Sequence, residues 1–187
     1  ANFPISVAVN VSAANLDHLD FPDRIEEACL RTCGSCEKLT VELTESAQQS
    51  VTYLLDTLTR LRIKGTSLSL DDFGTGYSSL VQLHQLPFSE MKIDRSFVVG
   101  MATSRECRAI VKSIIDLAHN LSLSVVAEGV ETAEAIDMLR SLGCDAAQGY
   151  YIAKPMPDAV WMVGRKHRLA AEPHGASLRD PAAGRAC

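Results

Sequence analysis

The chain has 187 residues, of which 47% are apolar and 22% are charged, and its formal net charge is −5. A chain of this length and composition can bury the core of one ordinary domain and is unlike a disordered protein. The acidic balance argues against a broad basic surface for a nucleic-acid polymer or an anionic membrane. No apolar run reaches membrane-spanning length and no signal-peptide pattern is present, so we expect a cytoplasmic protein without membrane contact from this segment.

Six cysteines raise the question of a zinc site or a redox motif. The closest spacing is the Cys-x-x-Cys pair of Cys33 and Cys36, but a zinc site takes about four ligands and no second pair of Cys or His follows at ligand spacing. We therefore expect reduced thiols, with Cys29, Cys33 and Cys107 on or near helices.

Short aliphatic or β-branched runs alternate along the chain with longer segments of helical period. This alternation is typical of a parallel sheet built from βα units. The runs predict six strands, at Ile5 to Val11, Leu39 to Leu43, Ser67 to Leu70, Met91 to Ile93, Leu123 to Ala127 and near Ala146 and Ala147. The longer segments predict helices at Pro22 to Thr32, Val51 to Arg62, Ser79 to Gln85, Arg105 to Asn120 and Ala133 to Ser141.

Alternate residues of a strand point to opposite faces of a sheet, and the predicted strands separate into an apolar face and a polar face. The apolar face is expected to pack under the helices. Its residues are Ile5, Val7, Val9, Leu39, Val41, Leu43, Leu68, Leu70, Leu123 and Val125.

The opposite face carries small or polar residues, and each strand ends there with a polar group. A barrel interior that opens at one mouth explains this better than an open doubly wound sheet, because barrel enzymes build their sites from the carboxyl ends of several strands. We therefore predict an α/β fold, an incomplete (β/α)8 TIM-like barrel of about six βα units, where a complete barrel takes roughly 250 residues. We expect further units before Ala1, a domain over residues 1–163 and a flexible tail over residues 164–187.

Adjacent carboxylates at a strand end are the most informative local feature, in the stretch Asp71-Asp72-Phe73-Gly74. Such a pair is costly unless a cation neutralises it. Hard oxygen ligands without a Cys or His pair favour Mg²⁺ or Mn²⁺ over zinc. These four residues are also compatible with a simple Asx-type turn that ends the strand.

Other strand ends add oxygen donors on the same face, namely Asn10, Glu42 and Glu128. Together with the two aspartates they are not easily explained as separate solvated charges, so we predict a metal centre. Lys92 on this face would hold a phosphate, orient a water or pair with a neighbouring carboxylate. Gln148 would position water or substrate, or lie buried with its amide bonded to the backbone.

Several motifs follow one another in a fixed order. They are Asn10-Val11-Ser12, Glu42-Leu43-Thr44-Glu45-Ser46, Asp71-Asp72-Phe73-Gly74-Thr75-Gly76-Tyr77-Ser78-Ser79, Lys92-Ile93-Asp94, Glu128-Gly129-Val130-Glu131-Thr132 and Gln148-Gly149-Tyr150. In this order they resemble the signature of the EAL domain family, and the resemblance covers nearly all of residues 1–160.

The resemblance implies a phosphodiesterase that cleaves cyclic-di-GMP to linear pGpG with two Mg²⁺ or Mn²⁺ ions. It implies that Asn10, Glu42 and Asp71 bind one ion. Asp71 would be shared with a second ion that Asp72 also holds, and Glu128 would bind that second ion or its water.

The resemblance also assigns roles around the metals. Lys92 would lie beside the attacking water, and Gln148 would line the same centre. Glu131 would support the site from behind the metal ligands. Glu45 would order the loop that contains Gly74, Thr75 and Gly76.

The tripeptide Glu-Ala-Leu, which names the family and would supply a further metal ligand, is absent from these residues. Because the other expected ligands are present, we expect an N-terminally truncated family domain with impaired activity. One alternative is a catalytically inactive receptor or protein-interaction module, and another is a different metal-dependent barrel lyase or hydrolase. The resemblance further suggests a homodimer and an upstream sensor or GGDEF-type domain in the native chain.

Overall fold

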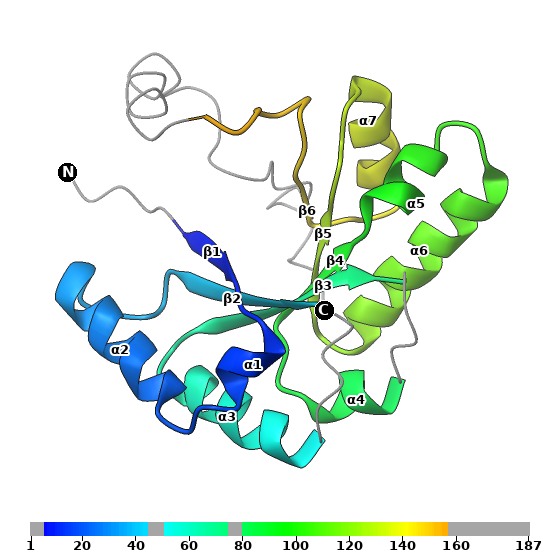
Figure 1. Cartoon of the computed structure of the whole chain (residues 1–187). Helices are drawn as coiled ribbons and strands as arrows, with labels where there is room; N and C mark the ends of the chain where they lie inside the picture. The colour runs from blue at the N-terminus through cyan, green and yellow to red at the C-terminus, as the bar shows by residue number, and fades with distance from the viewer. Residues whose placement is uncertain (1–5, 45–50, 75–79, 157–187) are drawn as a thin grey trace, which may run out of the picture. The chain divides into compact units, whose positions relative to one another are not determined.

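The computed structural model describes residues 6–44, 51–74 and 80–156, in which strands and helices alternate along the chain (Figure 1). The chain forms two compact units. The first comprises Ala1–Lys92 with Asn120–Ser124, and the second comprises Ile93–His119 with Val125–Cys187. Within the described ranges, no helix combines the length and the apolar character needed to cross a bilayer.

The first unit contains a sheet whose strands are neighbours in chain order. They are β1 (Val7–Asn10), β2 (Leu39–Thr44), β3 (Ser67–Phe73) and β4 (Glu90–Ile93). β1 pairs in parallel with β2, with Asn10 opposite Glu42, and β2 pairs in parallel with β3, with Thr44 opposite Asp71. Parallel pairing brings the carboxyl ends of these strands to one edge of the sheet.

The helices of the first unit are α1 (Ala13–Leu16), α2 (Phe21–Thr32), α3 (Val51–Ile63) and α4 (Leu80–Gln85). Helices α1, α2 and α3 lie along one face of β2 and β3 (Figure 1), and apolar side chains fill the space between them. The residues at the centre of this core have 3% or less of their surface exposed, namely Leu16, Val41, Leu43, Leu58, Leu61 and Leu68.

The second unit contains α5 (Arg95–Gly100), α6 (Arg105–Asn120), β5 (Ser124–Ala127), α7 (Ala133–Ser141) and β6 (Ala146–Ala147). β5 and β6 pair in parallel, with Val126 opposite Ala146. Helix α6 buries one face at the helical spacing, through Val111, Ile114, Ile115 and Ala118.

Every predicted strand and helix is present, with ends within a few residues of the prediction. Two short helices, α1 and α5, were not predicted. They have four and six residues, which is too short for an apolar repeat of helical period to show in the sequence.

The prediction for the apolar face of β1 is wrong. Val7 and Val9 are 54% and 43% exposed instead of packed under the helices, and all four residues of this strand are exposed. Among the described residues β1 has a hydrogen-bonded neighbour only in β2, and a strand at the edge of a sheet has fewer neighbours to cover it. Ile5 lies outside the described residues.

Candidate functional site

Three charged side chains lie buried toward the carboxyl ends of neighbouring strands in the first unit. Glu42 on β2, Asp71 on β3 and Lys92 on β4 are 7%, 8% and 4% exposed. Lys92 Nζ lies 3.0 Å from Glu42 Oε1 and 3.1 Å from Asp71 Oδ1. Such pairs lose much of their mutual attraction to desolvation, so they are weak contributors to stability. Their presence together at strand ends therefore points to a chemical role.

Asp72 has an unusual backbone conformation beside this group. Its φ of 56° lies in the left-handed region that few non-glycine residues adopt, and its N–H donates to Asp71 Oδ1 at 3.0 Å. Strand β3 continues through Phe73, so both aspartates lie within the strand and not in a turn after it. Strained residues of this kind are concentrated at functional sites.

The donor set of the first unit fits a divalent cation of the Mg²⁺ or Mn²⁺ type. Carboxylate oxygens of Asp71 and Asp72 lie within 4.8 Å of each other, which is slightly wider than the separation of up to about 4.2 Å between two oxygens bound to one ion at about 2.1 Å. Glu42 adds a third carboxylate, and Asn10, exposed at the end of β1, adds an amide oxygen opposite it. All of these are hard oxygen donors.

Glu90 begins β4 two residues before Lys92 and therefore points to the same face of the sheet. Burial raises the pKa of the Glu90 carboxyl, and the negative charges of Glu42 and Asp71 act in the same direction. Glu90 thus adds a carboxyl that is biased toward its neutral form to this polar face.

Glu128 and Gln148 follow directly on the strands of the second unit. The Glu128 N–H donates to the Ile93 carbonyl at 3.1 Å, and the Gln148 N–H donates to the Ala127 carbonyl at 2.8 Å. These backbone bonds hold both residues at the carboxyl ends of β5 and β6. Gln148 is exposed, so the alternative of a buried amide is wrong.

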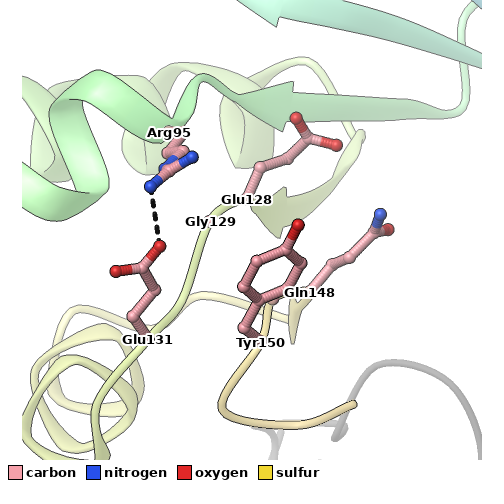
Figure 2. Close-up of a pocket in the computed structure, with 7 residues that line it drawn as sticks. Arg95, Glu128, Gly129, Glu131, Gln148 and Tyr150 are labelled. Carbon is pink, nitrogen blue, oxygen red and sulfur yellow. Dashed lines mark hydrogen bonds and ion pairs between the residues drawn. The ribbon is translucent and has the colours of Figure 1, made fainter. Parts of the chain in front are cut away.

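Glu128 and Gln148 line a pocket of about 190 Å³ in the second unit (Figure 2). Arg95, Glu131 and Tyr150 also line it. Arg95 Nη2 lies 2.7 Å from Glu131 Oε1. The lining therefore combines carboxylates, a guanidinium group, an amide and a phenol, which suits a polar ligand with several hydrogen-bonding groups.

Of the predicted residues, Asn10, Glu42, Asp71, Asp72 and Lys92 belong to the first unit, and Glu128, Glu131 and Gln148 belong to the second. Gly74 follows β3 with a φ of 102°, which favours glycine. Glu45, Thr75 and Gly76 lie outside the described residues, and their roles remain predictions.

Two pocket residues, Arg95 and Tyr150, were not predicted from the sequence. Arg95 directly follows the motif Lys92-Ile93-Asp94, and Tyr150 ends the motif Gln148-Gly149-Tyr150. Their position beside these motifs is a usable signal, but neither residue is a typical metal ligand, so a pattern of oxygen donors does not include them.

Comparison with known proteins identifies the family. The EAL domain family matches residues 1–155. The bifunctional diguanylate cyclase/cyclic di-GMP phosphodiesterase MucR of Pseudomonas aeruginosa is 42% identical over 153 residues, which are 81% of this chain and 22% of MucR.

Two solved structures support the same assignment. The MucR phosphodiesterase in complex with c-di-GMP has a TM-score of 0.78 at 41% identity, over 83% of this chain and 64% of that chain. The manganese and c-di-GMP complex of BlrP1 from Klebsiella pneumoniae has a TM-score of 0.75 at 31% identity, over 80% of this chain and 39% of that chain.

These matches confirm the predicted α/β class with TIM-like barrel architecture. The chain spans less than a quarter of the length of MucR, at 22%. The family match extends over most of the chain, from residue 1 to residue 155. This chain therefore belongs to the EAL domain family.

Proposed function

We propose that this chain carries the catalytic residues of a phosphodiesterase that hydrolyses cyclic-di-GMP to linear pGpG with two Mg²⁺ or Mn²⁺ ions. The relatives support the substrate and a role for metal, because MucR is named as a cyclic di-GMP phosphodiesterase and BlrP1 was solved with manganese and the dinucleotide. The observation that carries the proposal is the buried pairing of Lys92 with Glu42 and Asp71. A module that only binds a ligand gains little from keeping this arrangement.

The first unit would hold the ions. We assign Asn10, Glu42 and Asp71 to one ion, and Asp71 with Asp72 to the other. Ions bound in this way lower the pKa of a water and stabilise the attacking and leaving oxygens of an in-line displacement. Lys92 would keep the two carboxylates in place and orient the attacking water.

The second unit would supply Glu128 to the second ion or its water, and Gln148 to the water or the substrate. Glu131 would support Glu128 from the same segment of chain. Glu45 would order the loop that contains Gly74, Thr75 and Gly76.

The test is turnover of cyclic-di-GMP by the full-length natural protein with Mg²⁺ or Mn²⁺, with pGpG separated from substrate by chromatography. Asp71→Asn and Glu42→Gln should each lower the rate by about a hundredfold or more, because a displaced catalytic group alone costs that much. Asp23→Asn is the matched control, since Asp23 pairs with Lys64 and Arg60 on the surface of the same unit. Binding of the dinucleotide without product would support the receptor alternative and overturn hydrolysis.

We also propose a cytoplasmic homodimer in which a sensor or GGDEF-type domain precedes these residues. The diguanylate cyclase in the name of MucR supports such a partner domain. Light scattering on the full-length protein tests the dimer, and the natural sequence upstream of Ala1 tests the partner domain.

A further inference from the structure

The backbone at Arg95 in the second unit is held in place by a helix cap. Arg95 is the first residue of α5, directly after β4 and Asp94. The Asp94 carboxylate caps this helix by accepting a hydrogen bond from the Ser96 N–H at 2.9 Å and another from the Ser96 hydroxyl. The cap fixes the first turn of the helix, and with it the direction in which the Arg95 side chain leaves the backbone.

The Arg95 side chain contacts the segment that follows Glu128 at two places, through its aliphatic stem and through its guanidinium group. Its aliphatic stem lies against Gly129, where an added Cβ would stand 2.1 Å from Arg95 Cγ and 2.7 Å from Arg95 Cβ. Its guanidinium group reaches two residues further and pairs with Glu131 at 2.7 Å (Figure 2).

Backbone hydrogen bonds hold this segment on either side of Gly129. Glu128 is bonded to Ile93, and the Val130 N–H donates to the Gln148 carbonyl at 3.0 Å. Gly129 itself has a φ of 67°, a conformation that glycine adopts at little cost. A flexible residue therefore stands directly after Glu128, and the Arg95 stem lies on it.

We propose that Arg95 is a positioning residue that holds the segment from Glu128 to Glu131 and thereby fixes the direction of the Glu128 carboxylate. This inference rests on the proposed function in one respect, the catalytic use of Glu128. In this role Arg95 acts through packing on Gly129 and through its bond to Glu131, and the role requires no contact with the substrate.

The test compares Arg95→Ala, Arg95→Lys and Arg95→Met in the full-length natural protein. Lysine keeps the stem and a charge, methionine keeps only the stem, and alanine keeps neither. Arg140→Ala is the matched control, because Arg140 also forms an exposed ion pair in this unit, with Asp137.

We expect Arg95→Ala to lower kcat by about ten- to a hundredfold, with KM for cyclic-di-GMP changed less than about twofold. Amide hydrogen exchange at Val130, whose N–H is bonded in the native structure, should become faster. Arg95→Lys should restore most of kcat, Arg95→Met should fall between lysine and alanine, and the Arg140 variant should match wild type.

A rise in KM with unchanged kcat and unchanged exchange at Val130 would mean that Arg95 binds substrate, and it would overturn the proposal. The exchange measurement separates the two hypotheses. If the wild-type protein shows no turnover, the proposed function fails, while exchange at Val130 still reports whether Arg95 holds the segment.

A double-mutant cycle with Gly129→Ala gives a second, independent measurement. In the wild-type background the new methyl group meets Cγ of Arg95 at 2.1 Å, and in the Arg95→Ala background that atom is gone and only the 2.7 Å approach to Cβ remains. We expect Gly129→Ala to shift the urea unfolding midpoint less in the second background than in the first. Equal shifts in the two backgrounds would show that the stem does not press on Gly129.

Discussion

The Lys92 ammonium group lies between two carboxylates in a part of the first unit that water hardly reaches, since 5% of its side chain is exposed. Lys92→Met leaves Glu42 and Asp71 without this counter-charge. We expect the variant to lose about 3–5 kcal/mol of unfolding free energy in EDTA, as measured for broken buried pairs. Urea unfolding followed by circular dichroism measures this loss.

Lys64→Met is the control, because Lys64 also pairs with two carboxylates of the first unit, Asp23 and Glu26. Those carboxylates are about half exposed, at 58% and 41% of their side chains. Water can solvate them when the lysine is removed, so the loss should be clearly smaller. Equal losses of unfolding free energy in the two variants would mean that burial does not raise the cost of removing Lys92.

Glu90 gives a pH dependence of stability with a definite sign. Burial raises the pKa of this carboxyl above its ordinary value of 4.5, so its ionisation is harder in the folded state than in the unfolded state. Its contribution to stability is therefore fully present below about pH 4.5 and is lost as pH rises through the raised pKa. We expect Glu90→Gln in EDTA to raise the urea midpoint at pH 8 and to leave it nearly unchanged at pH 4.

A carboxyl with the opposite shift provides the control for Glu90. A hydrogen bond from the Ser104 hydroxyl holds the pKa of Glu106 below its ordinary value, so Glu106→Gln should lower the midpoint at pH 8. A gain for Glu90→Gln that is the same at pH 4 and pH 8 would contradict the electrostatic explanation.

At the scale of elements, the chain after β6 passes very close to the chain after β5. An added Cβ at Gly149 would lie 2.2 Å from both the backbone N and the O of Val130. These are backbone atoms held by hydrogen bonds to Gln148 and Tyr151, so they cannot move aside easily. We expect Gly149→Ala to cost about 1–3 kcal/mol by overpacking and to lower turnover with it.

Gly143→Ala is the control for Gly149→Ala, because it introduces backbone strain without a close contact to other atoms. Gly143 has a φ of 85° just past α7, with no atom within 4 Å of an added Cβ. Its substitution should cost about 1 kcal/mol through the left-handed backbone alone, with turnover unchanged. A wild-type rate in the Gly149 variant would show that the segments near Glu128 tolerate displacement.

The elements that the sequence predicted well are those with a strong repeat. Helix α6 has the predicted bounds, because its buried residues, from Val111 to Ala118, recur at helical spacing. The exposure of Val7 and Val9 was not predictable, because alternation identifies two faces of a strand but not what covers them. Helices α1 and α5 are too short for a pattern.

At the scale of the molecule, the predicted donors occupy the strand ends that alternation assigned to them. The sequence could not show that Lys92 forms ion pairs with both Glu42 and Asp71. It also could not show that the Arg95 side chain packs on Gly129. Contacts between residues far apart in the chain depend on three-dimensional packing, which periodicity does not encode.

Residues 1–187 by themselves should show little turnover of cyclic-di-GMP, because the Glu-Ala-Leu tripeptide of the family is absent from them. A longer natural chain that supplies this tripeptide should be active with Mg²⁺ or Mn²⁺. The measurement is pGpG formation by the two proteins at equal concentration. Robust metal-dependent turnover by residues 1–187 would contradict the need for the additional ligand.

The ion pairs of Lys92 also affect how tightly the proposed site would bind a metal ion. Because the ammonium group already neutralises part of the charge on Glu42 and Asp71, an arriving cation must share oxygens that have a resident partner. At the proposed metal centre, affinity would then be lower than for bare carboxylates. If the chain is the phosphodiesterase proposed above, metal occupancy would rise and fall with the free-ion concentration of the cell, so that hydrolysis of cyclic-di-GMP would follow metal supply as well as substrate.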